Sequence, residues 1–166
     1  SPNWQDDALF FDGNTFINIP DTTYYKFNRD FTLAASVRTT ALNQAIISRG
    51  QLTSWVPGAK TLFINSDGIV KFNVGGVGEV ISINPISDNQ WHHVAMTYLK
   101  GTVKLYIDGS LEGTGYLNLH EVSDENFDIF IGTQYPGVKN FNGIIKDVSI
   151  FDSALSDEDI SRLFQK

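Results

Sequence analysis

The stretch of residues 90–109 constrains the fold of this chain most strongly, because its side chains alternate with a period of two. In an extended strand, successive residues point to opposite faces. One face of residues 91–98 carries His92, Val94, Met96 and Tyr98, and the other carries Trp91, His93, Ala95 and Thr97. Both faces include apolar side chains, which is typical of a strand in the middle of a two-layer structure.

The turns of this stretch predict two further strands. Residues 99–101 reverse the chain, and residues 102–107 run back with Val103, Leu105 and Ile107 inward and Lys104 and Tyr106 outward. Asp108-Gly109 supplies the two positive-φ residues that a two-residue hairpin requires. Residues 110–115 then form a third strand, so we predict a three-stranded meander at the centre of a β-sandwich.

The rest of the chain reads as short β-strands separated by turn residues. The predicted strands are residues 8–11, 15–19, 31–38, 45–49, 62–64, 69–74, 79–83, 129–132 and 141–151. The glycine-rich residues 75–78 are expected to form a bend or bulge. One helix is predicted at residues 156–164, where Ser156 can cap the N-terminus and Ile160, Leu163 and Phe164 form an apolar stripe. The pattern therefore predicts an all-β fold with a short C-terminal helix.

Length and composition favour one domain, residues 1–166, with a large core. A chain of 166 residues buries roughly 70% of its unfolded surface. The hydrophobic fraction of 42% and the aromatic fraction of 13% exclude disorder. The formal charge is −7 and no cluster of Lys or Arg interrupts it, so we expect no nucleic-acid or anionic-membrane surface. Cysteine is absent, which excludes a disulfide scaffold, a thiolate metal site and a Cys nucleophile.

Two further features concern processing. The sequence has no run of 18 apolar residues, so membrane insertion is not expected. It begins Ser1-Pro2-Asn3 without Met and without a signal peptide, and we expect a mature protein or an excised module.

A series of short motifs carries a family resemblance over residues 8–164. The motifs are Phe10-Phe11-Asp12-Gly13, Phe31-Thr32-Leu33, Ile47-Ser48-Arg49-Gly50, Trp91-His92-His93-Val94-Ala95, Leu105-Tyr106-Ile107-Asp108-Gly109, Ile131-Gly132, residues 141–148 and the closing residues 154–160. Their order closely resembles the laminin G-like and pentraxin modules of the concanavalin A-like lectin/glucanase superfamily. The resemblance implies a jelly-roll β-sandwich of two curved antiparallel sheets. It implies no particular ligand, because that superfamily includes lectins, carbohydrate-binding modules, adhesion domains and enzymes.

Catalytic motifs are missing from the sequence. A β-glucanase of the resembled superfamily carries Glu-x-Asp-x-x-Glu on one strand, where the alternation places its carboxylates on a common face. No such spacing occurs here, and Gly-x-Ser-x-Gly, His-Glu-x-x-His and phosphate loops are also missing. His92 and His93 point to opposite faces of one strand and cannot share a metal ion. We therefore expect that the chain is not an enzyme.

The resemblance also bears on calcium. Residues 131–137 lack the Glu and Asp of the pentraxin calcium cluster, so pentraxin-type ligand capture is not expected. Modules similar to this one hold a structural calcium ion between the opening Asp-Gly turn and the Asp of the Phe-x-Gly-x-Ile-x-Asp strand, which are Asp12 and Asp147 here. Backbone carbonyls and water would complete the shell. In the alternative interpretation, Asp12 forms an Asx turn and Asp147 is a buried, hydrogen-bonded carboxylate.

Two loops without periodicity are the candidate binding segments. Residues 51–60 and 133–140 each combine Gly, Pro, one large aromatic residue and several amide or cationic donors. Sugar rings stack on exposed aromatic side chains while their hydroxyls bond polar groups. We predict that Trp55 and Tyr135 stack on a saccharide, and the predicted hydrogen-bonding residues are Arg49, Gln51, Gln134 and Asn140. Alternatively, each aromatic side chain folds over its own loop.

Two functions remain open on this basis. The first is a non-catalytic carbohydrate-binding module or lectin domain that binds an oligo- or polysaccharide. Such a module would be secreted and come from a larger extracellular glycoside-active protein, with a catalytic domain attached. The second is a laminin G-like adhesion domain that binds a protein partner.

Overall fold

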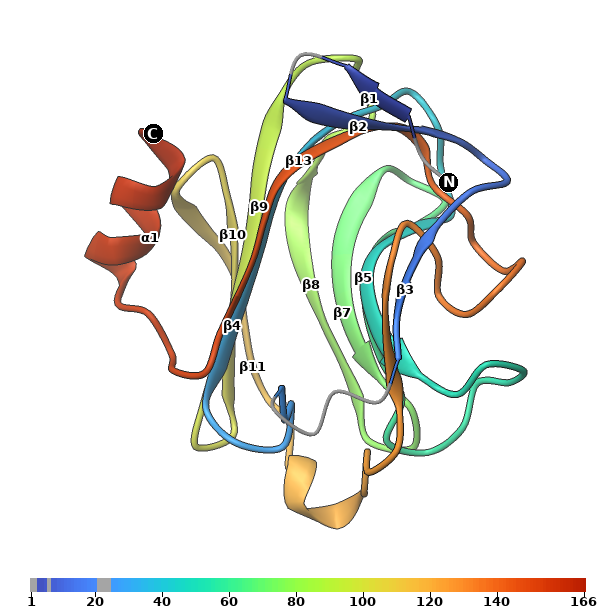
Figure 1. The fold of residues 1–166 in the computed structure, drawn as a ribbon. Coiled ribbons are helices and arrows are strands. Elements are labelled where there is room, and N and C mark those ends of the chain that lie inside the picture. The colour runs from blue at the N-terminus through green and yellow to red at the C-terminus, as the bar shows by residue number, and fades with distance from the viewer. Residues whose placement is uncertain (1–2, 6, 21–24) are drawn as a thin grey trace.

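The protein is a sandwich of two antiparallel β-sheets with a short helix on one outer face (Figure 1). The computed structural model describes residues 3–5, 7–20 and 25–166. The predicted all-β jelly-roll sandwich with a C-terminal helix is thus confirmed. We call the seven-stranded sheet sheet A and the six-stranded sheet sheet B, and the outer face of each is the one turned away from the other sheet.

Sheet A has the strand order β1-β2-β13-β4-β9-β10-β11. Its strands are β1 (Asn3–Gln5), β2 (Ala8–Asp12), β13 (Asn142–Phe151), β4 (Phe31–Arg38), β9 (His92–Leu99), β10 (Thr102–Ile107) and β11 (Ser110–Tyr116). The predicted meander is confirmed as β9, β10 and β11. Asp108 and Gly109 have φ values of 50° and 77° at its second turn, as the hairpin prediction requires.

Sheet B has the strand order β3-β12-β5-β6-β7-β8. Its strands are β3 (Ile17–Ile19), β12 (Asp128–Ile131), β5 (Gln44–Gly50), β6 (Lys60–Ile64), β7 (Ile69–Val74) and β8 (Gly78–Pro85). The predicted bend at residues 75–78 is observed, although β8 already begins at its last glycine. The connection between β11 and β12 contains a 3-10 turn, η1 (Leu119–Glu121), which the polar sequence did not indicate.

The core lies between the two sheets and follows the predicted alternation. Leu33 of β4 pairs with Met96 of β9, and both side chains are almost fully buried. Phe31 stacks on Tyr98 with ring centroids 5.6 Å apart and meets Phe72 of sheet B at 6.2 Å. Aromatic contacts of this kind add to the free energy of burying apolar area, so they join the two layers at one end of the sandwich.

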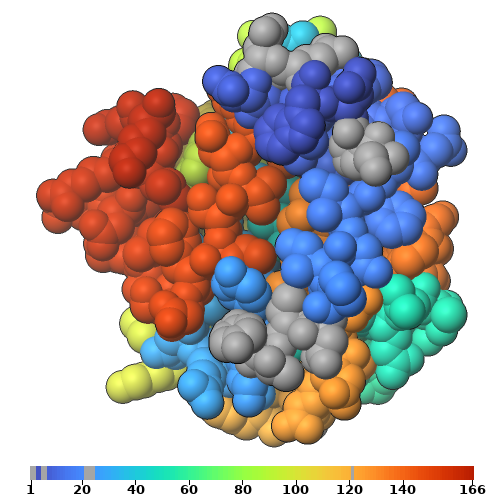
Figure 2. Space-filling view, in the orientation of Figure 1, coloured from blue at the N-terminus to red at the C-terminus, as the bar shows by residue number. Residues whose placement is uncertain are grey.

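Helix α1 (Asp157–Phe164) forms a third layer on the outer face of sheet A. The Ser156 side chain accepts a hydrogen bond from Asp159 N–H, as predicted for the N-cap. Ile160 is fully buried against Ala34 and Ala95, whose small side chains let the helix approach the sheet. This contact explains why the central strand β9 is apolar on both faces. In Figure 2 the red C-terminal segment stands beside the orange strand β13.

The two sheets also meet along their far edges, where β11 of sheet A lies against β8 of sheet B. A Cβ atom at Gly113 would lie 2.4 Å from the carbonyl oxygen of Ile81, so glycine is required for this approach. Glu112 accepts hydrogen bonds from the backbone N–H groups of Ile83 and Asn84 at 3.0 and 2.9 Å. The carboxylate therefore satisfies backbone donors that an edge strand would otherwise present to solvent.

Strand β1 was not predicted from the sequence. Its three residues pair with β2 at the edge of sheet A, and Trp4 is 69% exposed. Three residues are too few to show an alternating pattern of apolar and polar side chains. Strand β1 forms because it pairs with β2, not because it buries an apolar face. Within the described residues, no helix is long and apolar enough to cross a membrane.

Candidate functional site

The two predicted binding loops emerge from neighbouring strands of sheet B. Gly50 at the end of β5 pairs with Asp128, and Ile47 pairs with Ile131 at the end of β12. Because the strands are antiparallel, residues 51–59 leave one end of this pair and residues 132–141 leave the other. Both loops project from the outer face of sheet B, on the right of Figure 1. The face between them is therefore bordered by a loop at each end.

The floor of this face is made by outward side chains of β5, β6 and β12. Ser48 and Thr61 lie side by side with their hydroxyl oxygens 2.7 Å apart, and each is only 1% exposed. Phe63 is 8% exposed, and Phe130 is fully buried, with its ring in edge contact with Phe16. Residues on the outer face of a sandwich are usually solvated. Their burial shows that the flanking segments fold over the sheet.

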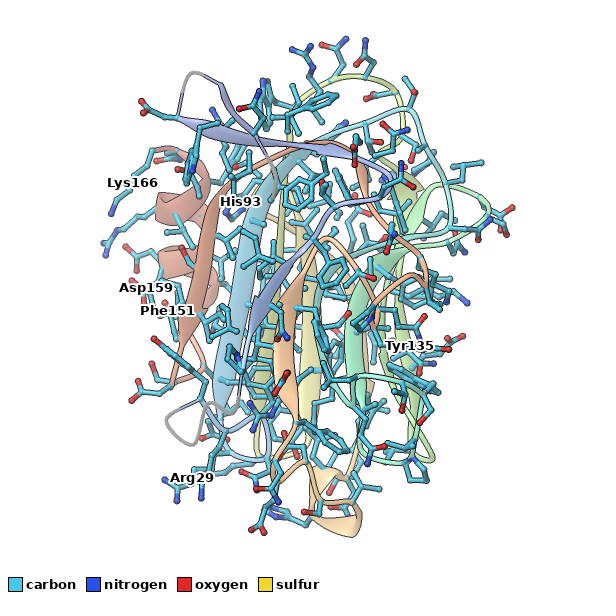
Figure 3. All side chains as sticks on the ribbon, turned by 45° about the vertical axis from the view of Figure 1, so that its right-hand side comes forward. Arg29, His93, Tyr135, Phe151, Asp159 and Lys166 are labelled. Carbon is cyan, nitrogen blue, oxygen red and sulfur yellow. The ribbon has the colours of Figure 1, made fainter. Side chains whose placement is uncertain are left out.

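Loop 133–140 is a compact, internally bonded turn. Val138 N–H donates to Tyr135 O at 2.9 Å, and Gln134 N–H donates to Val138 O at 2.9 Å. The hydroxyl of Thr133 lies 2.7–2.9 Å from Tyr135 O, Val138 O and Asn140 Oδ1. These bonds hold the Tyr135 side chain, which is partly buried, on the outer side of sheet B (Figure 3). The loop therefore presents one aromatic side chain in a fixed place.

Loop 51–59 is anchored to the glycine turn that follows β7. Gly58 N–H donates to Gly75 O at 2.9 Å, and Gly75 N–H donates to Ala59 O at 2.8 Å. A Cβ atom at Gly75 would lie 3.1 Å from Trp55 Nε1, so the indole packs closely against this turn. Trp55 is partly buried, while Gln51 is exposed. Trp55 therefore packs in part against a neighbouring turn, which differs from the alternative interpretation, in which the side chain folds over its own loop.

Charged groups of β7, β8 and loop 133–140 border the face. Lys71 donates to Glu79 at 2.9 Å, Asn73 donates to the same carboxylate at 3.2 Å, and these bonds lower the pKa of Glu79, with Lys71 the main cause. Lys139 Nζ lies 4.3 Å from the centroid of the Phe63 ring. Burial, with a smaller contribution from Lys71, lowers the pKa of Lys139. Lys71 and Asn73 were missed in the sequence, since only the pairing of β7 with β8 places them beside Glu79. Lys139 belongs to the cationic donors expected of loop 133–140.

Two predicted hydrogen-bonding residues need correction. Arg49 is 3% exposed, because its position in β5 points between the sheets rather than outward. Its Nε atom lies 3.0 Å from Asp124 Oδ2, and its guanidinium lies over the Phe27 ring. Gln134 is also buried, at 8% exposure. Neither side chain is available to a saccharide, so the predicted set reduces to Gln51, Trp55, Tyr135 and Asn140.

The predicted calcium pair also needs correction. Asp12 pairs with Asn142, five residues before Asp147 along β13, a separation of roughly 16 Å at strand spacing. Two ligands of one calcium ion lie within about 5 Å of each other, so these carboxylates cannot share an ion. Asp12 instead accepts from Asn14 N–H and Thr15 N–H at 2.9 and 3.0 Å in an Asx turn, and the bond from Asn14 is the main cause of its lowered pKa. Asp147 is exposed, not buried.

The two histidines lie on opposite faces of β9, as predicted. His92 Nδ1 lies 2.8 Å from Asp108 Oδ2, and its Nε2 lies 3.1 Å from Asp88 Oδ1. Burial opposes protonation, but the two carboxylates outweigh it and raise the pKa of His92. His93 is 6% exposed on the outer face of sheet A beside Phe164, and burial lowers its pKa. In the described residues no group of three His, Asp or Glu side chains could hold a metal ion.

Comparison with known families identifies the class of protein. A laminin G-type family model, described as the concanavalin A-like lectin/glucanases superfamily, matches residues 11–161. The chain belongs to this superfamily, as the motif order implied. No curated protein shows significant sequence similarity to it.

Solved structures share the fold at low sequence identity. The CBM40 domain of a Ruminococcus gnavus IT-sialidase bound to α2,3-sialyllactose is 18% identical with a TM-score of 0.68, over 90% of this chain and 95% of that one. Domain 4 of AbnA, an extracellular GH43 arabinanase from Geobacillus stearothermophilus in complex with arabinotriose, is 20% identical with a TM-score of 0.74, over 95% and 76%. Domains LG4-5 of the mouse laminin α1 chain are 18% identical with a TM-score of 0.68, over 95% and 45%. At these identities the likeness establishes the fold.

Proposed function

We propose that the chain is a non-catalytic carbohydrate-binding module whose saccharide lies against loops 51–59 and 133–140, on the outer side of sheet B. The observation that carries the proposal is the placement of both predicted aromatic loops on this one face. Trp55 and Tyr135 supply apolar ring surface, and Gln51 and Asn140 supply amide groups. Similar folds in the sialidase and arabinanase modules were solved with sugars bound, which supports the same class of ligand here.

The neighbouring polar groups suit hydroxyl recognition. Asn140 Oδ1 is engaged by Thr133, so the Asn140 amide nitrogen is left to donate to a ligand. Lys71, Asn73 and Glu79 already form a bonded set, which holds their side chains in place before a sugar arrives. Preorganised polar groups lose less conformational entropy on binding than mobile ones. We therefore expect these groups to bind a saccharide with modest affinity but with specificity for its hydroxyls.

The carboxylates of this face favour binding over hydrolysis. Glycoside hydrolysis needs two carboxyl groups about 5–9.5 Å apart, one of them protonated. The outward carboxylates on the strands of sheet B, all within the described residues, are Asp128 on β12 and Glu79 on β8. Four strand spacings separate them, on the order of 19 Å. Glu79 is also held ionised by Lys71, so it is unsuited to be the acid.

Two variants test the proposed face. Trp55→Ala and Tyr135→Ala should each weaken binding by about 1–3 kcal/mol, because each removes one stacking surface. Isothermal titration calorimetry measures the loss against a glycan first selected by affinity electrophoresis on polysaccharides. Tyr116→Ala, which removes an exposed aromatic residue of β11 in sheet A, is the matched control and should bind as the native chain does. Full binding by both loop variants, with folding intact, would place the site elsewhere.

The second function is protein adhesion, which the laminin likeness keeps open. A glycan array separates the two, since a protein-binding domain gives no sugar signal while still binding its partner. We also propose that the module is extracellular and is attached to a glycoside-active catalytic domain. Both parts of this proposal rest on the sialidase and arabinanase similarities.

A further inference from the structure

A cavity of about 450 Å³ lies on the other side of the molecule, between the outer face of sheet A and the end of α1. Its size is within the range of small-ligand sites. In Figure 2 it opens between the red helix and the orange strand β13, and Figure 3 shows His93 there, across the sandwich from Tyr135. We call it the α1 cavity. It is independent of the loop face of sheet B.

Strand register assembles the floor of the α1 cavity. Lys146 of β13 pairs with Ser36 of β4, and Ser36 pairs with His93 of β9. All three point outward, since their neighbours Ile145, Val37 and Val94 lie in the core between the sheets. Paired residues on one face of a sheet have Cβ atoms about 4.5–5.5 Å apart. An ammonium, a hydroxyl and an imidazole therefore stand in one row.

A bulge adds a carboxylate to this row. The pairing of β13 with β4 is interrupted between Lys146 and Ser149, and Asp147 in the interruption has φ of 53°. A non-glycine residue rarely adopts this conformation, and bulges redirect side chains beside functional sites. Asp147 lines the cavity close enough to favour protonation of His93 electrostatically. The backbone thus accepts local strain that brings a carboxylate to the cavity.

Lys146 and His93 both line the cavity and both retain bonding capacity. The Lys146 ammonium lies 4.5 Å from the centroid of the Trp91 ring, which positions it, and it forms no ion pair with the described carboxylates. The His93 side chain is buried, with 6% of its surface exposed, and its Nδ1 atom has no hydrogen-bond partner among the described residues. A buried polar atom without a partner costs roughly 1–3 kcal/mol. Such an atom calls for an explanation, and a partner from outside the chain is one.

Phe164 supplies the apolar wall. Its ring lies 6.2 Å from the His93 ring and packs on Gly109 of the β10–β11 turn. The cavity therefore combines the lysine side chains of Lys146 and Lys166, the hydroxyls of Ser36 and Ser149, one carboxylate and an aromatic wall. A ligand complementary to this set carries one anionic group and several hydroxyls on a compact apolar ring, which describes an acidic sugar.

We propose that the α1 cavity binds a carboxylated sugar of the uronic acid class. The sugar carboxylate pairs with Lys146, and its ring hydroxyls bond Ser36, His93 and Asp147. Because this site and the loop face lie on opposite sheets, the molecule could hold an acidic unit and a neutral chain at the same time. The assignment rests on the proposed carbohydrate function for its ligand class, but on separate residues.

NMR titration of the ¹⁵N-labelled native chain tests the proposal with three probes: D-glucuronate, D-glucose and acetate. Glucuronate should shift the signals of His93, Lys146 and Ser149 at lower concentration than either other probe, because only it has both the carboxylate and the hydroxyls. Equal shifts with acetate would reduce the cavity to an anion site and overturn the proposal. Shifts confined to other residues, or none, would also overturn it.

Substitution of Lys146 tests whether its ammonium group pairs with the sugar carboxylate. Lys146→Gln should weaken glucuronate binding about tenfold or more, the usual contribution of a hydrogen bond to a charged group. Lys100→Gln changes an exposed lysine at the far end of β9 and is the matched control, with native binding expected. Equal loss in both variants would overturn the assignment. Tyr135→Ala should leave glucuronate binding unchanged, so failure of the loop site and failure of the α1 cavity give different results.

Discussion

At the scale of single residues, the most demanding feature is a buried cluster of three charges. Lys60 and Arg49 both contact Asp124 Oδ2, at 3.1 and 3.0 Å, and all three side chains are at most 3% exposed. Burial lowers the pKa of Lys60, and Asp124 opposes this effect. Asp124 belongs to the connection between β11 and β12, while the two cations belong to β5 and β6. The cluster therefore ties that connection to the end of sheet B.

Removing the carboxylate should destabilise the fold strongly. Asp124→Asn leaves two buried cations without a counter-charge, and breaking such a pair costs about 3–5 kcal/mol. Urea denaturation followed by tryptophan fluorescence measures this change in the free energy of unfolding. Glu158→Gln removes one partner of an exposed helical pair and should change it by less than about 0.5 kcal/mol. A similarly small effect for Asp124→Asn would contradict the role given to the cluster.

His92 should make stability depend on pH. Its pKa is raised because Asp108 and Asp88 both favour the imidazolium, outweighing burial. A raised folded-state pKa contributes stability that is fully present below about pH 6.5, the unfolded value, and is lost as pH rises through the folded value. The melting temperature of His92→Asn should therefore fall furthest below that of the native chain at pH 5.5 to 6, and the gap should narrow by pH 8.5. A gap that is constant with pH would contradict this linkage.

At the scale of elements, glycine decides how two edge strands meet. Gly113 of β11 faces the backbone of β8, and a Cβ atom there would lie 2.4 Å from Ile81 O. Glu112 beside it bonds the N–H groups of Ile83 and Asn84. These contacts close one side of the sandwich without a continuous ladder of hydrogen bonds between the two sheets.

A single methyl group should disturb this closure. Gly113→Ala forces β11 away from β8, because the clash is with backbone that cannot rotate aside, and overpacking of this kind costs about 1–3 kcal/mol. Gly50→Ala is the control, since its Cβ would be 3.5 Å from Ala59 Cβ, an ordinary contact. Thermal melts of both variants compare the two positions. If the two melting temperatures fall equally, close approach of the strands is not what requires glycine at position 113.

At the scale of the whole molecule, the sandwich separates two surfaces of different chemistry. The outer face of sheet B carries the loop site, and the outer face of sheet A carries α1 and the α1 cavity. A rigid sandwich holds such surfaces apart without coupling them through a hinge. Recognition residues on loops above a rigid scaffold are a common arrangement in binding modules.

Binding of a structural calcium ion remains a prediction, and its effect would be on the stability of the whole molecule. If an ion is bound, excess EDTA should lower the melting temperature, because a ligand of the native state alone stabilises that state. Since Asp12 and Asp147 cannot share an ion, Asp12→Asn and Asp147→Asn should not both abolish the effect of EDTA. Identical melting curves with and without EDTA would contradict calcium binding.

The sequence determined the features that depend on neighbouring residues. The alternation in residues 91–98 predicted which side chains of β9 enter the core, the Asp108-Gly109 pair predicted the hairpin, and Ser156 predicted the helix cap. Each of these is governed by the backbone geometry and local hydrogen bonds of a few residues, so it can be read without the fold. The motif order also identified the superfamily that the comparison confirmed.

Only the tertiary structure decided which side chains come together in the candidate binding sites. Arg49 was predicted at a sugar site, but the register of β5 points it between the sheets, where Asp124, 75 residues away, pairs with it. Asp147 was predicted to face Asp12, but the pairing of β13 places it five residues away along the strand. The row of Lys146, Ser36 and His93 comes from three strands that are distant in sequence. Register and bulges depend on the summed packing of all strands, which no local pattern encodes.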